Sequence, residues 1–250
     1  MTASEFARRA VALLDLTDLS NGLNEAGVET LCARAMTPLG PVAAVCLWAG
    51  FVPQARRLLR DTPVKVATVV NFPDGGTDVS RAADEARYAL LDGADEIDVV
   101  MPYRSLMAGD RETVAALLGA VRAAVPASKT VKVILETGEL GRPDLIREAA
   151  RIAIATGADF IKTSTGKTAV SATPEAAEIM LEEIRASGRK VGFKPSGGIR
   201  KAADADVYLG LADRIMGPAW ATPATFRFGA SGLLDDLLTA DGTKMGRPDY

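Results

Sequence analysis

Apolar, β-branched runs alternate with amphipathic segments along most of this 250-residue chain. Short apolar runs between turn residues favour buried strands, whereas apolar residues at helical spacing favour helices. Eight strands are predicted, at Val42–Leu47, Val64–Val70, Glu96–Val100, Val131–Glu136, Phe160–Thr163, Val191–Pro195, Arg214–Met216 and Phe226–Gly229. Helices are predicted between them, at Thr77–Asp92, Arg111–Val125, Pro143–Thr156, Pro174–Ser187 and Ala202–Leu211. This alternation is typical of parallel βα units.

Eight such strands favour a (β/α)8 TIM barrel over an open, doubly wound sheet. Two further helices, at Ala3–Asp15 and Asn24–Met36, precede the first predicted strand and are expected to cap the barrel as extra N-terminal helices. No Ser/Gly-rich linker or charge block interrupts the middle of the chain, so residues 1–250 are predicted to form a single domain. The last ten residues, 241–250, lack periodicity and are expected to be a mobile tail.

The composition is that of an ordinary globular protein, with 48% hydrophobic residues, 24% charged residues and a net charge of −3. This weakly acidic balance gives no electrostatic footprint for nucleic acid. No stretch reaches the ~18 apolar residues of a membrane span, and the N-terminus lacks a signal-peptide pattern. The two cysteines, Cys32 and Cys46, are too few for a disulfide framework, so reduced thiols and a cytoplasmic location are expected.

The chain contains no histidine. This excludes His-dependent triads and His-ligated metal sites, and two cysteines make a zinc site unfavourable. Acid–base chemistry must then use Lys, Asp, Glu, Tyr or water. The composition therefore favours amine catalysis with no metal and no cofactor.

Two lysines, Lys162 and Lys194, stand in apolar runs predicted to be neighbouring strands. Burial disfavours a charged amine and a second cation nearby does so further, which yields the neutral amine that a Schiff-base nucleophile needs. Strand alternation turns Asp98 inward toward them, as a partner for a lysine or as a proton carrier. A lone strand lysine is usually exposed or snorkelling, but the pair favours catalysis. Glu96 and Lys132 are expected to form a structural ion pair lower in the barrel.

Three glycine-rich turns follow late strands: Gly166-Lys167, Ser196-Gly-Gly-Ile-Arg200 and Gly229-Ala-Ser-Gly232. Glycines let backbone amides approach an anion closely, and Lys167 and Arg200 add full charges. Barrels often bind phosphate near their last two strands. Glycine is also common in ordinary turns, so it is the combination that predicts a phosphorylated substrate.

Together these segments resemble the deoxyribose-phosphate aldolase family of class I, Schiff-base aldolases, over nearly the whole chain. The resemblance is carried by Leu14-Asp-Leu-Thr17, Ala44-Val-Cys46, Thr68-Val-Val-Asn-Phe-Pro73, Gly93-Ala-Asp-Glu-Ile-Asp-Val-Val100, Glu136-Thr-Gly-Glu139, Asp159-Phe-Ile-Lys-Thr-Ser-Thr-Gly-Lys167, Val191-Gly-Phe-Lys-Pro195 and Arg227-Phe-Gly-Ala-Ser231. It implies a (β/α)8 barrel that reversibly cleaves 2-deoxy-D-ribose 5-phosphate into D-glyceraldehyde 3-phosphate and acetaldehyde. Barrels of this kind are often homodimers.

The resemblance also implies roles for individual residues. Lys162 forms the imine, Lys194 is the ammonium that lowers its pKa, and Asp98 transfers protons with an ordered water. The C-terminal Tyr250 corresponds to a tyrosine that folds over the site in relatives, although a frayed chain end is the simpler interpretation.

Substrate and phosphate contacts are implied as well. The substrate contacts are Asp15, Thr17, Cys46 and Thr165, and the phosphate contacts are Gly166, Lys167, Gly197, Gly198, Arg200, Gly229 and Ser231. Cys46 is equally well interpreted as a small buried thiol. Two features depart from some relatives: Gly232 replaces a second serine, and Trp48-Ala-Gly50 replaces a Tyr-Pro-Arg-like sequence.

Three alternatives remain open at the level of sequence. Another class I lyase, such as a transaldolase or a 2-keto-3-deoxy-sugar-phosphate aldolase, would differ in the carbonyl compound that forms the imine. A phosphosugar isomerase or epimerase would use carboxylates and need no imine lysine. A non-catalytic phosphosugar-binding protein is disfavoured because Lys162, Lys194 and Asp98 are all present.

Overall fold

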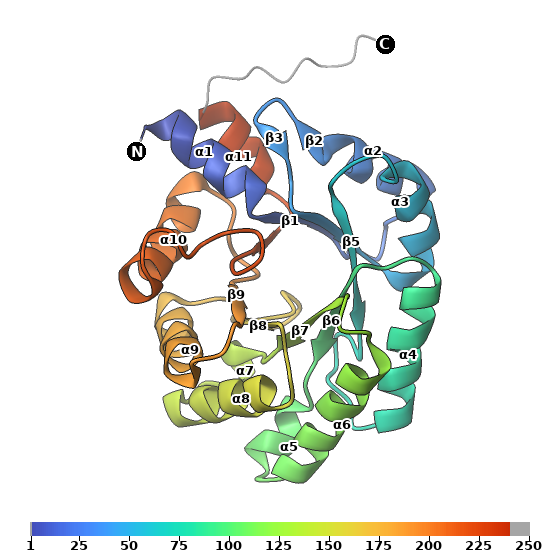
Figure 1. The fold of residues 1–250 in the computed structure, drawn as a ribbon, viewed down its shortest axis with the longest axis vertical. Helices are drawn as coiled ribbons and strands as arrows, with labels where there is room; N and C mark the ends of the chain where they lie inside the picture. Colours follow the sequence, from blue (N-terminus) through green and yellow to red (C-terminus); the bar gives the residue numbers. More distant parts are fainter. Residues whose placement is uncertain (1, 241–250) are drawn as a thin grey trace.

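Eight parallel strands form one sheet that curls into a barrel in the computed structural model, which describes residues 2–240 (Figure 1). The strands lie in the order β10-β1-β4-β5-β6-β7-β8-β9. Their bounds are β1 Leu14–Asp18, β4 Ala44–Leu47, β5 Lys65–Val70, β6 Glu96–Val100, β7 Thr130–Ile134, β8 Phe160–Lys162, β9 Gly192–Lys194 and β10 Phe228–Ala230. A short antiparallel hairpin, β2 Met36–Thr37 and β3 Gly40–Pro41, lies outside this sheet.

The ring closes between β9 and β10. The Phe193 amide donates to the Thr225 carbonyl at 2.8 Å, and the Gly229 amide donates to the Pro195 carbonyl at 2.9 Å. An isolated parallel bridge between Ser196 and Gly229 extends this seam to the carboxyl ends of the strands. The predicted TIM barrel is therefore confirmed.

Helices surround the ring and cover its outer face (Figure 1). They are α1 Ala3–Ala12, α2 Glu25–Arg34, α3 Val52–Leu58, α4 Val79–Leu91, α5 Tyr103–Met107, α6 Arg111–Ala124, α7 Thr137–Leu140, α8 Pro143–Ala155, α9 Pro174–Ser187, α10 Ala202–Met216 and α11 Leu233–Ala240, with a 3-10 turn η1 at Ala49–Phe51. Pro143 and Pro174 begin α8 and α9, where proline fits because the first helical turn leaves its amide unpaired. The buried helix faces and the outward strand residues form the main hydrophobic core.

The first barrel strand, β1, was missed by the sequence pattern. Its outward residues Leu14 and Leu16 are apolar, but Asp15 and Thr17 alternate with them and face the barrel interior. Because polar residues break the apolar run, the hydrophobic pattern predicted that this segment ends a helix. In the structure α1 stops at Ala12.

The predicted strand at Arg214–Met216 is wrong. Those residues form the last turn of α10, where Leu209, Ala212 and Ile215 continue the buried stripe at helical spacing. The count of eight strands was correct because the missed β1 offsets this error. Lys162 and Lys194 consequently stand on the sixth and seventh barrel strands, not the fifth and sixth.

The N-terminal helices also need correction. Only α1 precedes the barrel, and it packs beside α11 from the other end of the described chain (Figure 1). The second expected helix, α2, follows β1 and is an ordinary βα helix. The predicted tail, 241–250, lies outside the described residues.

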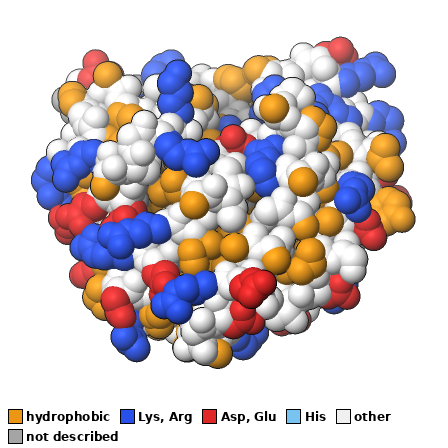
Figure 2. All heavy atoms as spheres, turned by 60° about the horizontal axis from the view of Figure 1, so that its bottom comes forward, with side chains coloured by type: hydrophobic (Ala, Val, Ile, Leu, Met, Phe, Trp, Pro, Cys, Tyr) orange, Lys and Arg blue, Asp and Glu red, His pale blue; other side chains and the backbone are white. Residues whose placement is uncertain are grey.

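The outer surface carries charges of both signs. Lys and Arg side chains are interspersed with Asp and Glu side chains on the face shown in Figure 2. Within residues 2–240, no helix combines the length and apolar character needed to cross a membrane. Both cysteines are buried free thiols.

Candidate active site

Lys162 and Lys194 are register partners on the neighbouring strands β8 and β9. Their side chains point into the barrel and are 2% and 0% exposed. Gly192 lies below Lys194 and packs against the Phe160 ring. A Cβ at this position would lie 2.4 Å from the ring, so there is no room for a side chain. The prediction that these lysines stand on neighbouring strands and point inward is confirmed.

Asp98 lies between the two lysines. Its Oδ2 accepts from Lys162 Nζ at 2.9 Å and from Lys194 Nζ at 2.8 Å. Its Oδ1 accepts from Lys132 Nζ at 2.9 Å, so three lysine amines surround one fully buried carboxylate. The predicted convergence of Asp98, Lys162 and Lys194 is thus present, with a third lysine added.

A second layer of charges lies beneath this group. Lys132 Nζ contacts Glu96 Oε2 at 2.5 Å, which confirms the predicted buried ion pair. Lys194 Nζ donates to Asp15 Oδ2 at 2.5 Å. Arg227 joins the layer by donating to Asp15 Oδ1 at 2.6 Å and to Glu96 Oε1 at 2.8 Å.

The buried network therefore contains four basic side chains and three carboxylates. Three cations are enough to balance the carboxylates of Asp15, Glu96 and Asp98. If all four basic side chains were protonated, the network would carry a net positive charge in a site shielded from water. Removing one proton gives a neutral network. The site thus favours one uncharged amine, and the pKa shifts indicate which one.

Burial is the largest cause that lowers the pKa of Lys162 below its ordinary value. Asp98 opposes this effect, whereas the Lys194 ammonium adds to it. Burial alone would also lower the pKa of Lys194, but the carboxylates of Asp15 and Asp98 outweigh burial and raise it. Lys132 and Arg227 likewise have raised pKa values because carboxylates outweigh their burial. Lys162 is therefore the amine that loses its proton first.

The pKa of Asp98 lies well below its usual range. Burial would raise the pKa, but the charges of Lys132, Lys162 and Lys194 outweigh it. Asp15 has a lowered pKa for the same reason. Both carboxyl groups are ionised at neutral pH and hold the neighbouring ammonium groups in place.

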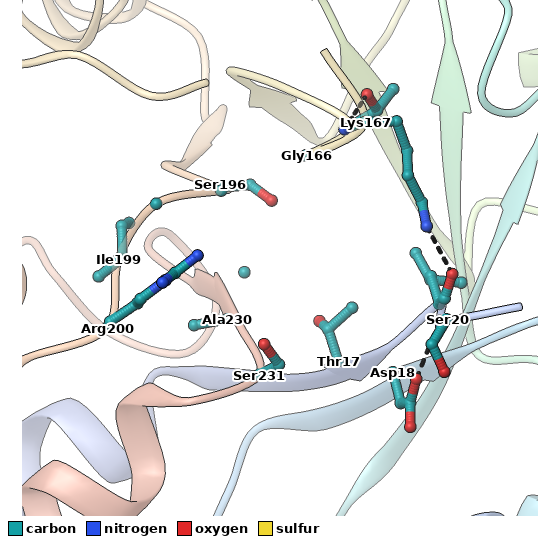
Figure 3. Close-up of a pocket in the computed structure, with 15 residues that line it drawn as sticks. Thr17, Asp18, Ser20, Gly166, Lys167, Ser196, Ile199, Arg200, Ala230 and Ser231 are labelled. Carbon is teal, nitrogen blue, oxygen red and sulfur yellow. Dashed lines mark hydrogen bonds between the residues drawn. The ribbon is translucent and has the colours of Figure 1, made fainter. Parts of the chain in front are cut away.

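A cavity of about 310 Å³ opens at the carboxyl ends of the strands, above the buried network. It is lined by Thr17, Thr165, Ser196 and all seven residues predicted to contact phosphate: Gly166, Lys167, Gly197, Gly198, Arg200, Gly229 and Ser231. In Figure 3, Thr17, Ser196, Arg200 and Ser231 face one common space. The loops after β8, β9 and β10 thus bring their glycine turns together.

Close backbone approach explains one of these glycines. A Cβ on Gly197 would lie 2.6 Å from the Ser171 side chain and 3.3 Å from the Gly166 Cα. The residue also has a φ of +83°, which side chains disfavour. The β8 and β9 loops can therefore pack against each other only with glycine at this position.

The two cations at the cavity differ in their contacts. Arg200 is exposed and its guanidinium points toward the cavity (Figure 3). Lys167 reaches across the mouth, where its Nζ donates to the Leu19 carbonyl at 2.7 Å. The same Nζ lies 5.9 Å from the centre of the Trp48 ring. Lys167 thus connects the β8 loop to the segment after β1.

Two predicted substrate-contact residues lie in polar surroundings. Thr17 lines the cavity, and its hydroxyl donates to the Asp15 carbonyl, two residues earlier, at 2.8 Å. Thr165 is buried, and its hydroxyl donates to Glu136 Oε2 at 2.6 Å. Its hydroxyl proton is therefore already engaged inside the protein.

Cys46 and Tyr250 complete the predicted set. Cys46 is fully buried on β4 in a small apolar cluster with Leu19 and Val69. Burial raises the pKa of its thiol, which therefore stays neutral. Tyr250 lies outside the described residues. Among residues 2–240, no group of three or more His, Cys, Asp or Glu side chains is arranged to hold a metal ion.

Sequence reasoning missed three charged residues of the site. Lys132 was assigned to a separate ion pair, Arg227 was noted only within a motif, and Glu136 was placed inside a strand. Arg227 did carry a signal, because it alternates with Phe226 and Phe228 in the last predicted strand. An arginine at an inward position of a barrel strand indicates a buried partner.

A buried lysine with a lowered pKa on an inner barrel strand, beneath a cavity lined by glycine turns and two cations, is the arrangement typical of a Schiff-base lyase. The family described as DeoC/LacD family aldolases matches residues 9–220. The chain therefore belongs to the DeoC/LacD family of aldolases.

Individual relatives agree with this assignment. A protein of Agrobacterium fabrum named deoxyribose-phosphate aldolase is 57% identical over 235 residues, which cover 94% of this chain and 91% of that protein. A Toxoplasma gondii crystal structure assigned as deoxyribose-phosphate aldolase has a TM-score of 0.88 at 28% identity, covering 98% of this chain and 99% of its own. A crystal structure from Coccidioides immitis with the same assignment has a TM-score of 0.81 at 29% identity, covering 92% of this chain and 85% of its own.

Proposed function

We propose that this protein is a deoxyribose-phosphate aldolase, which reversibly cleaves 2-deoxy-D-ribose 5-phosphate into D-glyceraldehyde 3-phosphate and acetaldehyde through a lysine Schiff base. The observation that carries the proposal is the buried Lys162 amine with its lowered pKa, held 2.9 Å from Asp98. The 57% identity to the Agrobacterium fabrum protein of that name supports the substrate.

In the cleavage direction, neutral Lys162 Nζ attacks C1 of the open-chain sugar. Loss of water from the adduct gives a protonated imine, which serves as an electron sink. The C3 hydroxyl then loses its proton while the C2–C3 bond breaks. D-glyceraldehyde 3-phosphate leaves, and the electron pair remains on Lys162 as an enamine. Protonation of the enamine carbon and hydrolysis of the new imine release acetaldehyde and the free amine.

The neighbouring charges have distinct roles in this proposal. Lys194 stays an ammonium and lowers the pKa of Lys162, because Asp15 and Asp98 hold its own proton. Asp98 carries protons between the substrate and an ordered water, since its Oδ2 already lies at hydrogen-bond distance from Lys162. Lys132 binds the other oxygen of Asp98 and fixes its orientation.

The cavity at the rim orients the substrate. Its glycine turns and Arg200 receive the phosphate, together with Lys167 and Ser231. Thr17, and Asp15 beneath it, lie on the side of the hydroxyl groups. Thr165 and Cys46 complete the substrate surroundings, and Tyr250 is proposed to assist proton transfer.

Three broader properties belong to the same proposal. We infer that residues 1–250 act as one domain, that the enzyme works in the cytoplasm and that it forms a homodimer. The free thiols Cys32 and Cys46 support a reducing compartment. Light scattering coupled to size-exclusion chromatography tests the dimer, and a mass of 26.2 kDa would reject it.

Borohydride reduction in the presence of acetaldehyde tests the mechanism, followed by peptide mass spectrometry. We expect an ethyl group on Lys162 and none on Lys194. In a matched Lys162→Ala protein the adduct should be absent and turnover should fall by at least about 10⁴-fold, with unchanged circular dichroism. Folded wild-type protein without an adduct, or with the adduct on Lys194, would reject Lys162 as the imine lysine.

A further inference from the structure

Glu136 has an unusual backbone conformation at the rim of the barrel. It lies two residues after Ile134, the last residue of β7, and has φ 57° and ψ 59°, in the left-handed region. Among residues 2–240, only Asn71 is another non-glycine residue with positive φ, and it too follows a barrel strand at this rim. Such conformations persist where surrounding contacts hold them, and they cluster at functional sites.

The Glu136 carboxylate is fully buried and binds the neighbouring β8 loop. Oε2 accepts from the Thr165 hydroxyl at 2.6 Å, and both oxygens accept from the Thr165 amide at 3.3 Å. Oε1 also lies 3.3 Å from the Thr168 hydroxyl. The left-handed turn at Glu136 aims the carboxylate sideways at this loop, whereas a continued strand would have aimed it into the barrel.

Thr165 passes this restraint on to the phosphate side of the cavity. A hydroxyl has one proton, which Thr165 gives to Glu136, so its lone pair is free to accept from the Lys167 amide at 3.0 Å. These two bonds span the turn at Gly166, which has a φ of +77° and lines the cavity. Glu136 thereby determines the path of the Thr165–Lys167 segment.

Two backbone contacts keep Glu136 close to the β8 loop. The Thr137 amide donates to the Thr163 carbonyl at 2.9 Å. At Gly138, an added Cβ would lie 2.0 Å from the Val170 carbonyl oxygen, so the two loops touch through bare backbone. These contacts hold the backbone on both sides of Glu136 against the β8 loop.

We propose that Glu136 is a positioning residue for phosphate binding, which shapes the Thr165–Lys167 segment through Thr165 and does not contact the reacting atoms. This inference rests on the proposed aldolase function. It assigns to the Glu136-Thr-Gly-Glu139 motif a role in affinity for phosphorylated substrates, separate from imine chemistry.

The geometry further indicates that Glu136 acts as a hydrogen-bond acceptor rather than as a charge. A glutamine could keep its oxygen toward Thr165 and direct its amide toward Thr168. The Thr168 hydroxyl could accept that bond, because it already donates to the Val170 carbonyl at 3.0 Å. Glu136→Gln should therefore retain the loop path that Glu136→Ala loses.

The test compares 2-deoxyribose 5-phosphate with unphosphorylated 2-deoxyribose. For Glu136→Ala we expect KM for the phosphorylated sugar to rise about 10-fold with little change in kcat, and kcat/KM for 2-deoxyribose to stay within about threefold. Glu136→Gln should remain within about threefold of wild type for both sugars. The matched control is Glu139→Ala, an exposed glutamate three residues away in the same motif.

Thr165→Val removes the hydroxyl that donates to Glu136 and therefore tests the same contact. This variant alone tests the inference if Glu136→Ala does not fold. It should raise KM for the phosphorylated sugar similarly, and combining it with Glu136→Ala should raise KM little more, because both changes remove the same interaction. An equal loss on both sugars, or additive effects in the double variant, would overturn the inference. Wild-type protein inactive on both sugars would instead reject the proposed function.

Discussion

The charged groups inside the barrel and those at its rim use opposite physical strategies. The interior network of Asp15, Glu96, Asp98, three lysines and Arg227 lies on strands or directly before one, and is at most 6% exposed. The rim cavity is built from loops, backbone amides and the exposed Arg200. In the interior each charge is held by other charges, so a change at one residue alters the pKa of the next. At the rim, water and salt screen the charges, and a change alters affinity more than chemistry.

Arg227→Met should produce the largest energetic effect. It leaves Asp15 and Glu96 short of a buried cation, which costs about 3–5 kcal/mol of unfolding free energy. Urea unfolding followed by circular dichroism measures this loss. Arg200→Ala, a cation removed from the rim, should change stability by no more than about 0.5 kcal/mol. Similar losses in both variants would contradict the distinction between interior and rim.

Lys194→Leu should alter the pH dependence of catalysis. Without Lys194, the three carboxylates balance Lys132, Arg227 and a protonated Lys162, so the pKa of Lys162 rises. Activity needs the neutral amine and increases as pH rises through that pKa, so the acid limb of the kcat/KM profile moves to higher pH. Activity at neutral pH should therefore fall by at least about 10-fold and recover in part as the pH is raised.

The pH profile of Lys194→Leu should be recorded beside that of Arg200→Ala, whose acid limb should match wild type. An unmoved acid limb in Lys194→Leu would show that Lys194 does not set the pKa of Lys162.

Arg200→Ala should produce the smallest effect. Loss of one charge-assisted contact to phosphate should raise KM for 2-deoxyribose 5-phosphate about 10-fold and leave kcat nearly unchanged. The difference from wild type should shrink as salt is added, because Arg200 is exposed. Steady-state kinetics at two ionic strengths measure both effects, and a fall in kcat equal to the rise in KM would place Arg200 in the chemical step.

The hydrophobic pattern predicted most barrel strands well, because their outward faces are apolar and their helices are amphipathic. It failed at β1, where Asp15 and Thr17 face inward among the charges of Lys194 and Arg227. The polar residues Asp15 and Thr17, which belong to the candidate active site, interrupt the apolar run by which a strand is predicted. It failed again at Arg214–Met216, where three residues are too few to distinguish a strand from the last turn of α10.

By itself, the sequence determined the barrel, the inward direction of Lys162, Lys194 and Asp98, and the gathering of three glycine turns at one end. These follow from local periodicity, which repeats along the chain. Only the tertiary structure decided that Lys132 and Arg227 join the network, that Glu136 turns out of its strand toward Thr165, and that Lys167 reaches Leu19. Each of these depends on a distance between separate strands or loops. The protonation state of Lys162 belongs with them, because it is determined by the sum of all the charges that the barrel brings together.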